Sequence, residues 1–452
     1  MPRPSCSARI RSRVLRDRSA RHRVAVAAVI GMFAVTGAMG CGSDEGAGSG
    51  DIGAVVRWDS AGLRIVEASR SVLEGLPVRR IDPHPVVRVG EREGRDEEMF
   101  GMVTDATMLA ADRLAVADAQ QRRILVFGLD GEFRYAIGRP GEGPGEFRAL
   151  QRMSVIDDTL YVPDVTARRA QRFTLDGQRV DDRRMAGSIG LQSGIEYHRP
   201  GRFSQPHVYW ITPDGFPRDV PEGDGPHRVN QIVARYDTLG GTKLDTLDAA
   251  PAYYVHLTLD ERGIAEELGL THYPVGNVLP HPAAPDVRVT FLVDEPVIGW
   301  SGRPELTLYT PEYEPTARFR FDSPPVDIPL DDERFRQWSV AWWQRDQYPI
   351  RTRAWNVLTP PETPARFHAL RAGRDGHIWV AIGPEPPPEQ GAAGGPDPAY
   401  WTRWLRIARD GTPLEWVITP QGNLLEVGPD AVLVLETDDL GVQRVAVFRY
   451  AA

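Results

Sequence analysis

A glycine-rich stretch, IGRPGEGPGEFRAL at residues 137–150, is the first segment whose residue types suggest chemistry. Four of its fourteen residues are glycine, as in the loops whose backbone amides bind the phosphates of a nucleotide. Such a loop leads into a helix, and the Walker form adds a lysine and a serine or threonine. Here an apolar, β-branched strand pattern follows, and the one lysine of the chain is Lys243. We therefore do not expect this stretch to bind a nucleotide.

An aromatic segment, LDDERFRQWSVAWWQRDQY at residues 330–348, is the second candidate. Its early acids, the spacing of its aromatic residues and the proline that follows predict a short helix inserted between late strands. One interpretation is a helix that packs its aromatic stripe onto the protein's own surface. The other is a recognition surface, because aromatic side chains often anchor partners. The candidates for binding a protein or a sugar-like ligand are Trp338, Trp342, Trp343, Tyr348 and Trp355.

Motifs for metal binding and nucleophilic catalysis are not found in the sequence. The ten histidines are scattered, without the HExxH spacing of zinc sites, and no GxSxG nucleophile elbow occurs. A calcium site needs convergent oxygen ligands from Asp, Glu and Asn. The four asparagines show no equivalent spacing, and the acids at 331–333 are explained by a helix start. We expect no catalytic residue and no cofactor, and calcium stays open as a ligand.

The first 40 residues predict an export signal. Eight arginines precede the apolar run VAVAAVIGMFAV, which is short for a membrane span. The ending TGAMGC resembles the lipobox of bacterial lipoproteins, in which the cysteine, here Cys41, is lipidated. Ala38 stands where that family usually has leucine, and an ordinary signal with a chance cysteine is the alternative. Residues 41–54, rich in Gly and Ser, predict a flexible tether. The expected location is the cell envelope, on the periplasmic or outer-membrane face.

The charge of the chain bears on its partners. The net charge of −9 becomes −16 without residues 1–40, because that segment carries eight arginines and one acid. A domain this acidic is a poor partner for nucleic acid. We expect a monomer that reaches the membrane through its N-terminal lipid and binds an envelope protein or glycan.

An internal repeat organises the rest of the chain. Residues 113–131, RLAVADAQQRRILVFGLDG, align with residues 159–177, TLYVPDVTARRAQRFTLDG, at an offset of 46 and with nine of nineteen positions identical. Each copy reads as strand, turn, strand and Asp-Gly turn, and a further strand follows. A period near 46 with only β elements is the length of a propeller blade. Weaker copies lie at residues 229–241, 304–321, 373–383 with 404–418, and 432–450.

These residues resemble the NHL-type six-bladed β-propellers, and the chain is similar to exported six-bladed propeller lipoproteins of bacteria. That repeat has an Asp, an Asn-x-Arg-Ile run, an apolar-Phe pair, an Asp-Gly turn and a glycine-rich link. The matching positions are Asp118, Arg123, Ile124, Phe127, Asp130, Gly131 and the glycines of residues 138–145, with Gln121 in place of the asparagine. The resemblance is strong over residues 96–180, fair over 370–452 and thin between them. It implies an all-β fold of six four-stranded blades over residues 55–452, with the helical insertion near 330–348.

The propeller interpretation assigns parts to several segments. Residues 137–150 become the link from the outer strand of one blade to the inner strand of the next. Residues 85–90 are expected to add the outermost strand to the last blade, which closes the ring without an exposed edge. Repeated polar residues are expected to bond neighbouring backbone and hold adjacent blades. They are Asp118, Arg123, Asp164, Arg169, Asp438 and Arg444.

Two functions remain open from the sequence. The preferred one is a lipid-anchored binding or scaffolding module of the envelope. The alternative comes from the calcium-dependent lactonases and related hydrolases, which are also six-bladed propellers and hold an ion near the central channel. A propeller alone does not distinguish them, because unrelated activities occur on the same ring. We expect the chain not to be an enzyme.

Overall fold

The computed structural model describes residues 55–184, 207–213, 225–237, 243–256, 278–280, 287–323, 365–382 and 403–451, apart from a few positions inside these ranges. The chain divides into Met1–Gly50 and a compact unit, Asp51–Ala452. All the described residues belong to the second unit.

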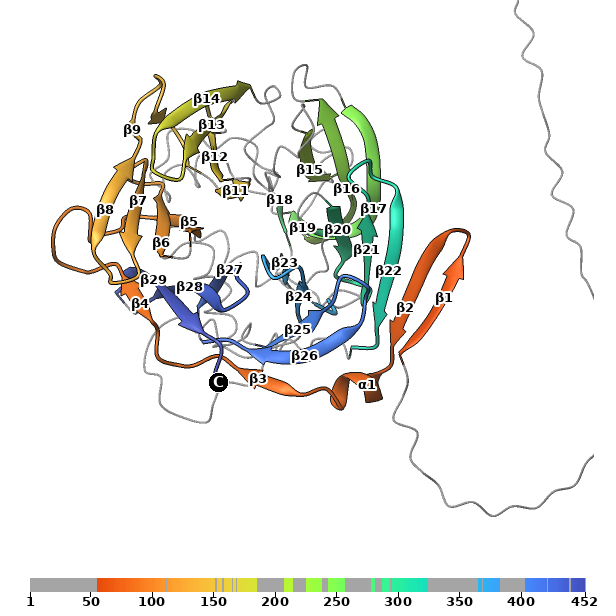
Figure 1. The fold of residues 1–452 in the computed structure, drawn as a ribbon. Coiled ribbons are helices and arrows are strands. Elements are labelled where there is room, and N and C mark those ends of the chain that lie inside the picture. The colour runs from red at the N-terminus through yellow and green to blue at the C-terminus, as the bar shows by residue number, and fades with distance from the viewer. Residues whose placement is uncertain are drawn as a thin grey trace, which may run out of the picture. The chain divides into compact units, whose positions relative to one another are not determined.

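The described strands of this unit form six sheets of four or more strands, and Figure 1 shows them around a common centre. We number the blades in chain order. Blade 1 holds β5 (Val103–Ala110), β6 (Arg113–Asp118), β7 (Arg123–Gly128) and β8 (Phe133–Ile137). Blade 2 holds β11 (Ser154–Ile156), β12 (Thr159–Asp164), β13 (Arg169–Thr174) and β14 (Arg179–Arg184). Blade 3 holds β15 (His207–Pro213), β16 (Gly225–Asp237), β17 (Lys243–His256) and β18 (Val278–Pro280).

The later blades follow the same plan. Blade 4 holds β19 (Val287–Leu292), β20 (Glu295–Trp300), β21 (Glu305–Tyr309) and β22 (Pro315–Phe321). Blade 5 holds β23 (Ala369–Ala372), β24 (Ile378–Ala381), β25 (Arg403–Ile407) and β26 (Pro413–Ile418). Blade 6 holds β27 (Asn423–Val427), β28 (Ala431–Thr437) and β29 (Gln443–Arg449). The fold is a β-propeller, which confirms the all-β prediction.

The repeat in the sequence is also a repeat of strand register. Leu114 faces Phe127 in blade 1, as Leu160 faces Phe173 in blade 2. In both blades the register shifts directly before that phenylalanine. These bulges increase the local twist of the sheet. The shared spacing of apolar residues therefore produces the same local geometry in both blades.

The hydrophobic core lies between neighbouring blades. One cluster joins residues of blades 1 and 2, including Ile124, Phe147 and Phe173, and another joins blades 6 and 1, including Val116, Phe127 and Val445. Further clusters join blades 4 and 5 and blades 5 and 6. Blades 4, 5, 6 and 1 thus each bury apolar side chains against the next blade, so these sheets depend on one another for their stability.

The N-terminal segment supplies outer strands to three successive blades. β2 (Leu63–Ala68) pairs in parallel with β22 of blade 4, and β1 (Val56–Ser60) pairs with β2. β3 (Val78–Arg80) pairs in parallel with β26 of blade 5, and β4 (Val87–Val89) pairs antiparallel with β29 of blade 6. Figure 1 shows this segment along the outside of the three sheets. The predicted closing strand at 85–90 is confirmed, whereas the strands added to blades 4 and 5 were not predicted.

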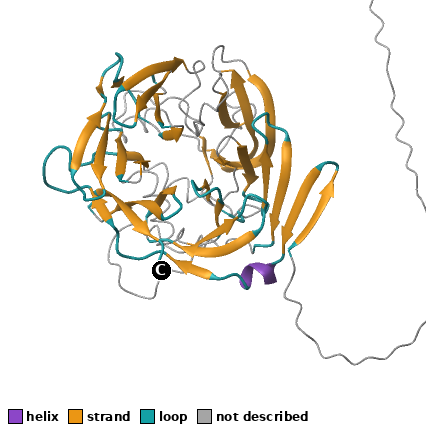
Figure 2. Cartoon of the chain, in the orientation of Figure 1, coloured by secondary structure: helices purple, strands orange, loops and turns teal. Residues whose placement is uncertain are grey.

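Helix is scarce in the described part of the chain, as Figure 2 shows. The helix there, α1 (Arg70–Glu74), follows the N-cap Ser69, and the carbonyl of its Leu73 accepts the indole N–H of Trp416 at 2.7 Å. Within the described residues, no helix is long and apolar enough to cross a membrane. The helical insertion predicted at 330–348 lies outside the described residues.

Candidate functional site

Asp118, at the end of β6, anchors the chain that enters blade 1. Its carboxylate is wholly buried and accepts the N–H groups of Gly101 and Met102 in the entry link at 2.9 and 3.1 Å. It also accepts the N–H groups of Gln120 and Gln121 in the following turn at 3.0 and 3.1 Å. Buried N–H groups require acceptors, so this one carboxylate satisfies four of them. The entry link is thereby held against the β6–β7 turn.

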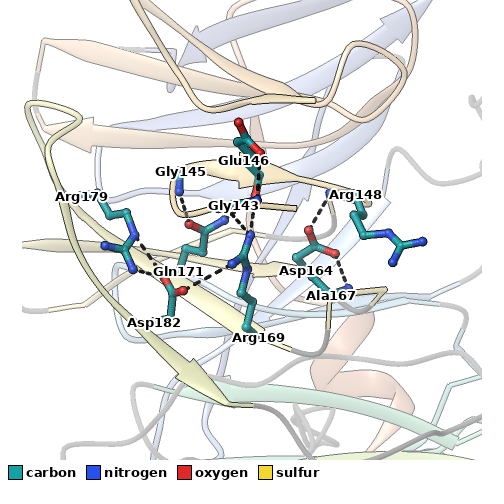
Figure 3. Close-up of polar contacts among 10 residues, drawn as sticks. All are labelled: Gly143, Gly145, Glu146, Arg148, Asp164, Ala167, Arg169, Gln171, Arg179 and Asp182. Carbon is teal, nitrogen blue, oxygen red and sulfur yellow. Dashed lines mark hydrogen bonds and ion pairs between the residues drawn. The ribbon is translucent and has the colours of Figure 1, made fainter. Parts of the chain in front are cut away.

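Asp164, at the end of β12, makes the equivalent contacts in blade 2 (Figure 3). Its Oδ2 accepts the N–H of Arg148 at 2.7 Å, and its Oδ1 accepts those of Ala149 and Ala167 at 3.3 and 2.9 Å. This side chain is also wholly buried. The two copies of the repeat therefore use their aspartates in the same way.

Guanidinium and amide groups bind the same link between blades 1 and 2. Nη2 of Arg169 donates to the carbonyl oxygens of Gly143 and Glu146 at 2.6 and 2.9 Å. Gln171 accepts the N–H of Gly145 at 2.7 Å and donates to the Glu146 carbonyl at 2.7 Å. Figure 3 shows these side chains of β13 directed at the link. The link is bound at both its N–H groups and its carbonyls.

The corresponding arginine of blade 1 contacts its own entry link. Nη2 of Arg123 donates to the carbonyl oxygen of Asp96 at 2.7 Å. Residues 90–102, which include Asp96, lead from β4 into β5. Arg123 and Arg169 thus share their type of partner as well as their place in the repeat.

In blade 6, Asp438 and Arg444 contact each other. The Asp438 carboxylate accepts Nη1 of Arg444 at 2.9 Å, and the N–H groups of Leu440 and Val442 at 3.0 and 2.9 Å. These N–H groups belong to the β28–β29 turn. The Asp438 side chain is 33% exposed, in contrast to the buried aspartates of blades 1 and 2.

Strand register changes the match that the sequence suggests for blade 6. Glu436 lies opposite Arg444, as Asp118 lies opposite Arg123. The ladder continues one pair beyond Glu436, so Asp438 falls in the turn rather than at the strand end. Glu436 binds Arg88 of β4 through two hydrogen bonds of 2.7 and 3.0 Å. In this blade the acid at the equivalent position holds the closing strand.

The glycine-rich link folds onto itself. Its short strands β9 (Arg139–Pro140) and β10 (Glu146–Phe147) pair in parallel. Glu146 accepts the N–H of Gly143 at 2.8 Å and the Nε of Arg139 at 2.9 Å, and these two contacts lower the pKa of its carboxyl. At Gly138, φ is +81°, and a Cβ would lie 2.1 Å from the Phe147 ring. Backbone N–H groups of the link that would bind a phosphate are instead bound within the protein. The link leads into strand β11 rather than into a helix. The prediction that this stretch links two blades is confirmed.

Polar side chains of the inner strands join consecutive blades near the centre of the ring. Each reaches the backbone of the next blade at the start of its inner strand or within it. We call these four side chains the inner-strand belt. The contacts, from blade 4 round to blade 2, are Thr290 with the N–H of Ala372, Arg371 with the carbonyl of Leu424, Glu426 with the N–H of Met108 and Asp105 with the N–H of Met153, at 2.9, 3.3, 3.3 and 2.6 Å.

The carboxylates of the inner-strand belt have further partners. Glu426 accepts the hydroxyl of Thr107 and lies 3.3 Å from Nη1 of Arg374, which also donates to the Met108 carbonyl at 2.7 Å. Thr107 and Asp105 share the inner strand β5. Among the described residues, no group of three or more His, Cys, Asp or Glu is placed to hold a metal ion.

A second ionic cluster lies on blade 5. Arg406 contacts Asp375 at 3.1 Å and Glu415 at 2.7 Å, and the side chains of both acids are almost fully buried. His377 lies 3.0 Å from Asp375, and Arg79 of β3 lies 3.1 Å from Glu415. A buried charge is costly unless it is paired, so the alternating acids and bases compensate one another. The cluster joins the added strand β3 to its blade. No spacing in the sequence indicates this cluster, because its members come from four separate segments.

The other residues singled out from the sequence lie outside the described residues. They are the lipidation candidate Cys41 and the aromatic candidates Trp338, Trp342, Trp343, Tyr348 and Trp355.

Comparisons with known proteins agree with the architecture. A family model described as a 6-bladed beta-propeller matches residues 93–188, which contain the two clearest copies of the repeat. No curated protein matches the chain.

The solved structures that match the chain include proteins from three bacteria. A Bacteroides fragilis protein, named as exported, is 10% identical; the match covers 83% of this chain and 100% of that one, with a TM-score of 0.36. Virginiamycin B lyase from Staphylococcus aureus is 11% identical, with 76% and 95% covered and a TM-score of 0.30. A calcium-binding protein, regucalcin, from Agrobacterium tumefaciens is 11% identical, with 83% and 96% covered and a TM-score of 0.30.

Proposed function

We propose that this chain is an exported, lipid-anchored β-propeller of the bacterial envelope that binds a protein or a carbohydrate-like ligand. The observation that supports a binding or scaffolding role is the inner-strand belt. Its four side chains hold the backbone of the neighbouring blades. Groups bonded in this way add rigidity, and a rigid ring presents its loops at fixed positions for recognition.

The ligand-binding residues in this proposal are the aromatic set of residues 338–355. Aromatic side chains offer a large contact area with few rotatable bonds, and they stack on sugar rings or fill pockets of a protein partner. The five members are Trp338, Trp342, Trp343, Tyr348 and Trp355.

The proposed anchor is a lipid on Cys41. The arginine-rich start, the apolar run and the TGAMGC ending support it. A Cys41→Ser variant should appear in the soluble fraction, whereas the parent chain should sediment with membranes. Equal partition of the two chains would contradict the anchor without bearing on the ligand.

The ligand is tested with the purified full chain. Calorimetry with the purified chain against a panel of soluble envelope glycans measures carbohydrate binding, and photocrosslinking in cells from position 344, beside the aromatic pair at 342 and 343, measures protein binding. Trp342→Ala should weaken binding by about thirtyfold, because losing an aromatic anchor costs about 2 kcal/mol. Leu440→Ala, which removes an exposed apolar side chain from the β28–β29 turn, is the control and should bind as the parent does. If neither measurement gives a specific complex, the binding proposal fails.

Calcium binding distinguishes this proposal from the alternative, a calcium-dependent hydrolase with its site in the central channel. Asp105 and Glu426, on neighbouring inner strands, are the carboxylates that such a site would use first. A ligand present at 100 times its Kd adds about 2.7 kcal/mol to the free energy of unfolding. A rise in Tm on replacing chelator with millimolar calcium, abolished by Asp105→Asn, would favour the calcium-dependent hydrolase. An unchanged Tm is the expected result for the binding module.

A further inference from the structure

The N-terminal hairpin ends in a strand with an open edge. β1 and β2 are joined by Ala61 and Gly62, and β2 attaches the hairpin to blade 4. Among the described strands β1 pairs with β2 alone, and all of its residues are exposed. Figure 1 shows it at the end of this sheet. An edge of this kind is a template for pairing with another chain.

The hairpin turn determines which backbone groups of β1 point outward. Both turn residues have positive φ, +50° and +85°, as a two-residue type I′ turn requires. Ser60 and Leu63, which flank the turn, are therefore a hydrogen-bonded pair, and the pairs alternate along the ladder from there. Consequently Arg57 and Asp59 direct their N–H and carbonyl groups away from β2. An added strand would bond to these groups.

The sequence of β1, VRWDS, is complementary to itself in the antiparallel direction. A two-fold axis at Trp58 places Arg57 of each copy opposite Asp59 of the other, and both residues carry the outward backbone groups. An axis at Arg57 or Asp59 would place like charges opposite each other, which is destabilising. An axis between two residues would match an outward group with an inward one. We infer that a second copy of this chain pairs with β1 in the register centred on Trp58.

Contacts within one chain hold side chains of β1 in fixed positions. Nη2 of Arg57 donates to Thr412 of blade 5 at 2.6 Å, and the Trp58 ring lies 6.0 Å from the Arg320 guanidinium. Trp58 and Val56 are 38% and 55% exposed, so pairing would remove apolar surface from water. Opposed strands of two such hairpins gain cross-strand aromatic and charge contacts on both faces. The inference departs from the monomer that the sequence suggests.

Lipid anchoring would assist pairing without being required for it. If Cys41 holds both copies on one membrane, their local concentration rises, and a small contact can then persist. The pairing itself depends on β1 alone, so failure of the anchor in fractionation would leave this inference standing.

Disulfide trapping tests the register in the full chain. A two-fold axis at position 58 brings the two Cα atoms to about 4.5 Å, within the range that a disulfide bridges. Oxidised Trp58→Cys chains should run as a covalent dimer on non-reducing electrophoresis. The parent chain, whose two cysteines are Cys6 and Cys41, sets the background. Val180→Cys, an exposed residue on the outer strand β14 of blade 2, is the matched control and should give no dimer above it.

A second pair of variants keeps the test independent of Trp58. Arg57→Cys and Asp59→Cys, expressed together, should form a mixed dimer, because these positions face each other at about 5.5 Å between Cα atoms. Absence of dimer both here and with Trp58→Cys would overturn the inference. So would a covalent product between Trp58→Cys and a different protein, which would identify β1 as an edge for another partner.

Charge reversal separates pairing through β1 from random collision. Asp59→Arg in the Trp58→Cys background should abolish the dimer. The new arginine of each copy then lies opposite Arg57 of the other copy, and like charges repel. Adding Arg57→Asp to this variant restores opposite charges and should restore the dimer. A dimer that persists through the single reversal would overturn the register.

Discussion

Blades 1 and 2 and blade 6 carry the same repeated aspartate and arginine and use them differently. Asp118 and Asp164 are wholly buried and bind N–H groups of the chain entering their blade. Asp438 is one-third exposed and binds N–H groups of its own turn. Arg169 follows the first pattern, whereas Arg444 binds Asp438.

Two features accompany the difference: the extra ladder pair that moves Asp438 into the turn, and the length of the segment that enters each blade. Residues 90–102 lead from β4 to β5 and residues 138–153 lead from β8 to β11, but residues 419–422 alone separate β26 from β27. A long link can lie across the turn of the next blade and offer its N–H groups to a buried acid. A short link goes directly from strand to strand. Whether a repeated acid binds the entry link of its blade therefore depends on the length of that link as well as on the place of the acid in the repeat.

The largest expected effect compares two Asp→Ala substitutions. Asp118→Ala removes the acceptor of four N–H groups in a buried site, and it should lower the free energy of unfolding by about 3 kcal/mol or more. Asp438→Ala should cost about 1 kcal/mol, because water can replace the carboxylate at the exposed turn. Urea unfolding followed by circular dichroism measures both. Equal losses would show that burial of the acid does not decide its contribution.

The next effect compares two glycines of the same link. Gly138 and Gly145 both have positive φ, so Ala at either position costs about 1 kcal/mol of backbone strain. At Gly138 the new Cβ also meets the buried ring of Phe147, which adds about 1–3 kcal/mol. At Gly145 it meets open space. The Tm of Gly138→Ala should therefore lie well below that of Gly145→Ala. The reverse order would contradict the packing described for the link.

A smaller effect compares the two arginines. Arg169→Lys should lower the free energy of unfolding by about 1–2 kcal/mol, because an ammonium group does not reproduce the directed contacts to two carbonyls. Arg444→Lys should cost about 0.5 kcal/mol, since it weakens one partly exposed ion pair. Scanning calorimetry of both variants measures this difference. A larger loss of stability from Arg444→Lys would mean that the ion pair in blade 6 contributes more than the contacts of Arg169 to the link.

Local patterns in the sequence predict the blades well. The alternation around Leu114 and Leu160 gives the paired strands, and the Asp-Gly turns place Gly131 and Gly177 at the positive φ they require. The closing strand β4 is also predictable from its alternating valines.

Contacts between blades are harder to predict from the sequence. The three-residue strand β3 is too short to stand out, and the extra ladder pair in blade 6 shifts Asp438 away from the expected place. The inner-strand belt joins residues such as Glu426 and Met108, which are far apart in the chain. No local spacing encodes such a contact, because it depends on how the ring closes.

The smallest expected effect is a pH dependence that compares the carboxylates of the link and the turn. The N–H of Gly143 and the guanidinium of Arg139 lower the pKa of Glu146 below its ordinary value of 4.5. At Asp438 burial acts to raise the pKa, but the hydrogen bonds from Arg444 and the turn N–H groups outweigh it and lower the pKa.

A carboxyl whose pKa is lower in the folded than in the unfolded state stabilises the fold above the unfolded pKa, and this contribution is lost as the pH falls through the folded pKa. Glu146→Gln should therefore be less stable than the parent near pH 7, and the gap should close as the pH falls through the lowered folded pKa of Glu146. Asp438→Asn should show the same closing gap with a smaller effect, because burial offsets part of the contribution of its hydrogen bonds. Urea midpoints measured across this range test both variants. A gap at position 146 that stays constant with pH would mean that hydrogen bonds available to the neutral amide, rather than the charge of Glu146, hold the link.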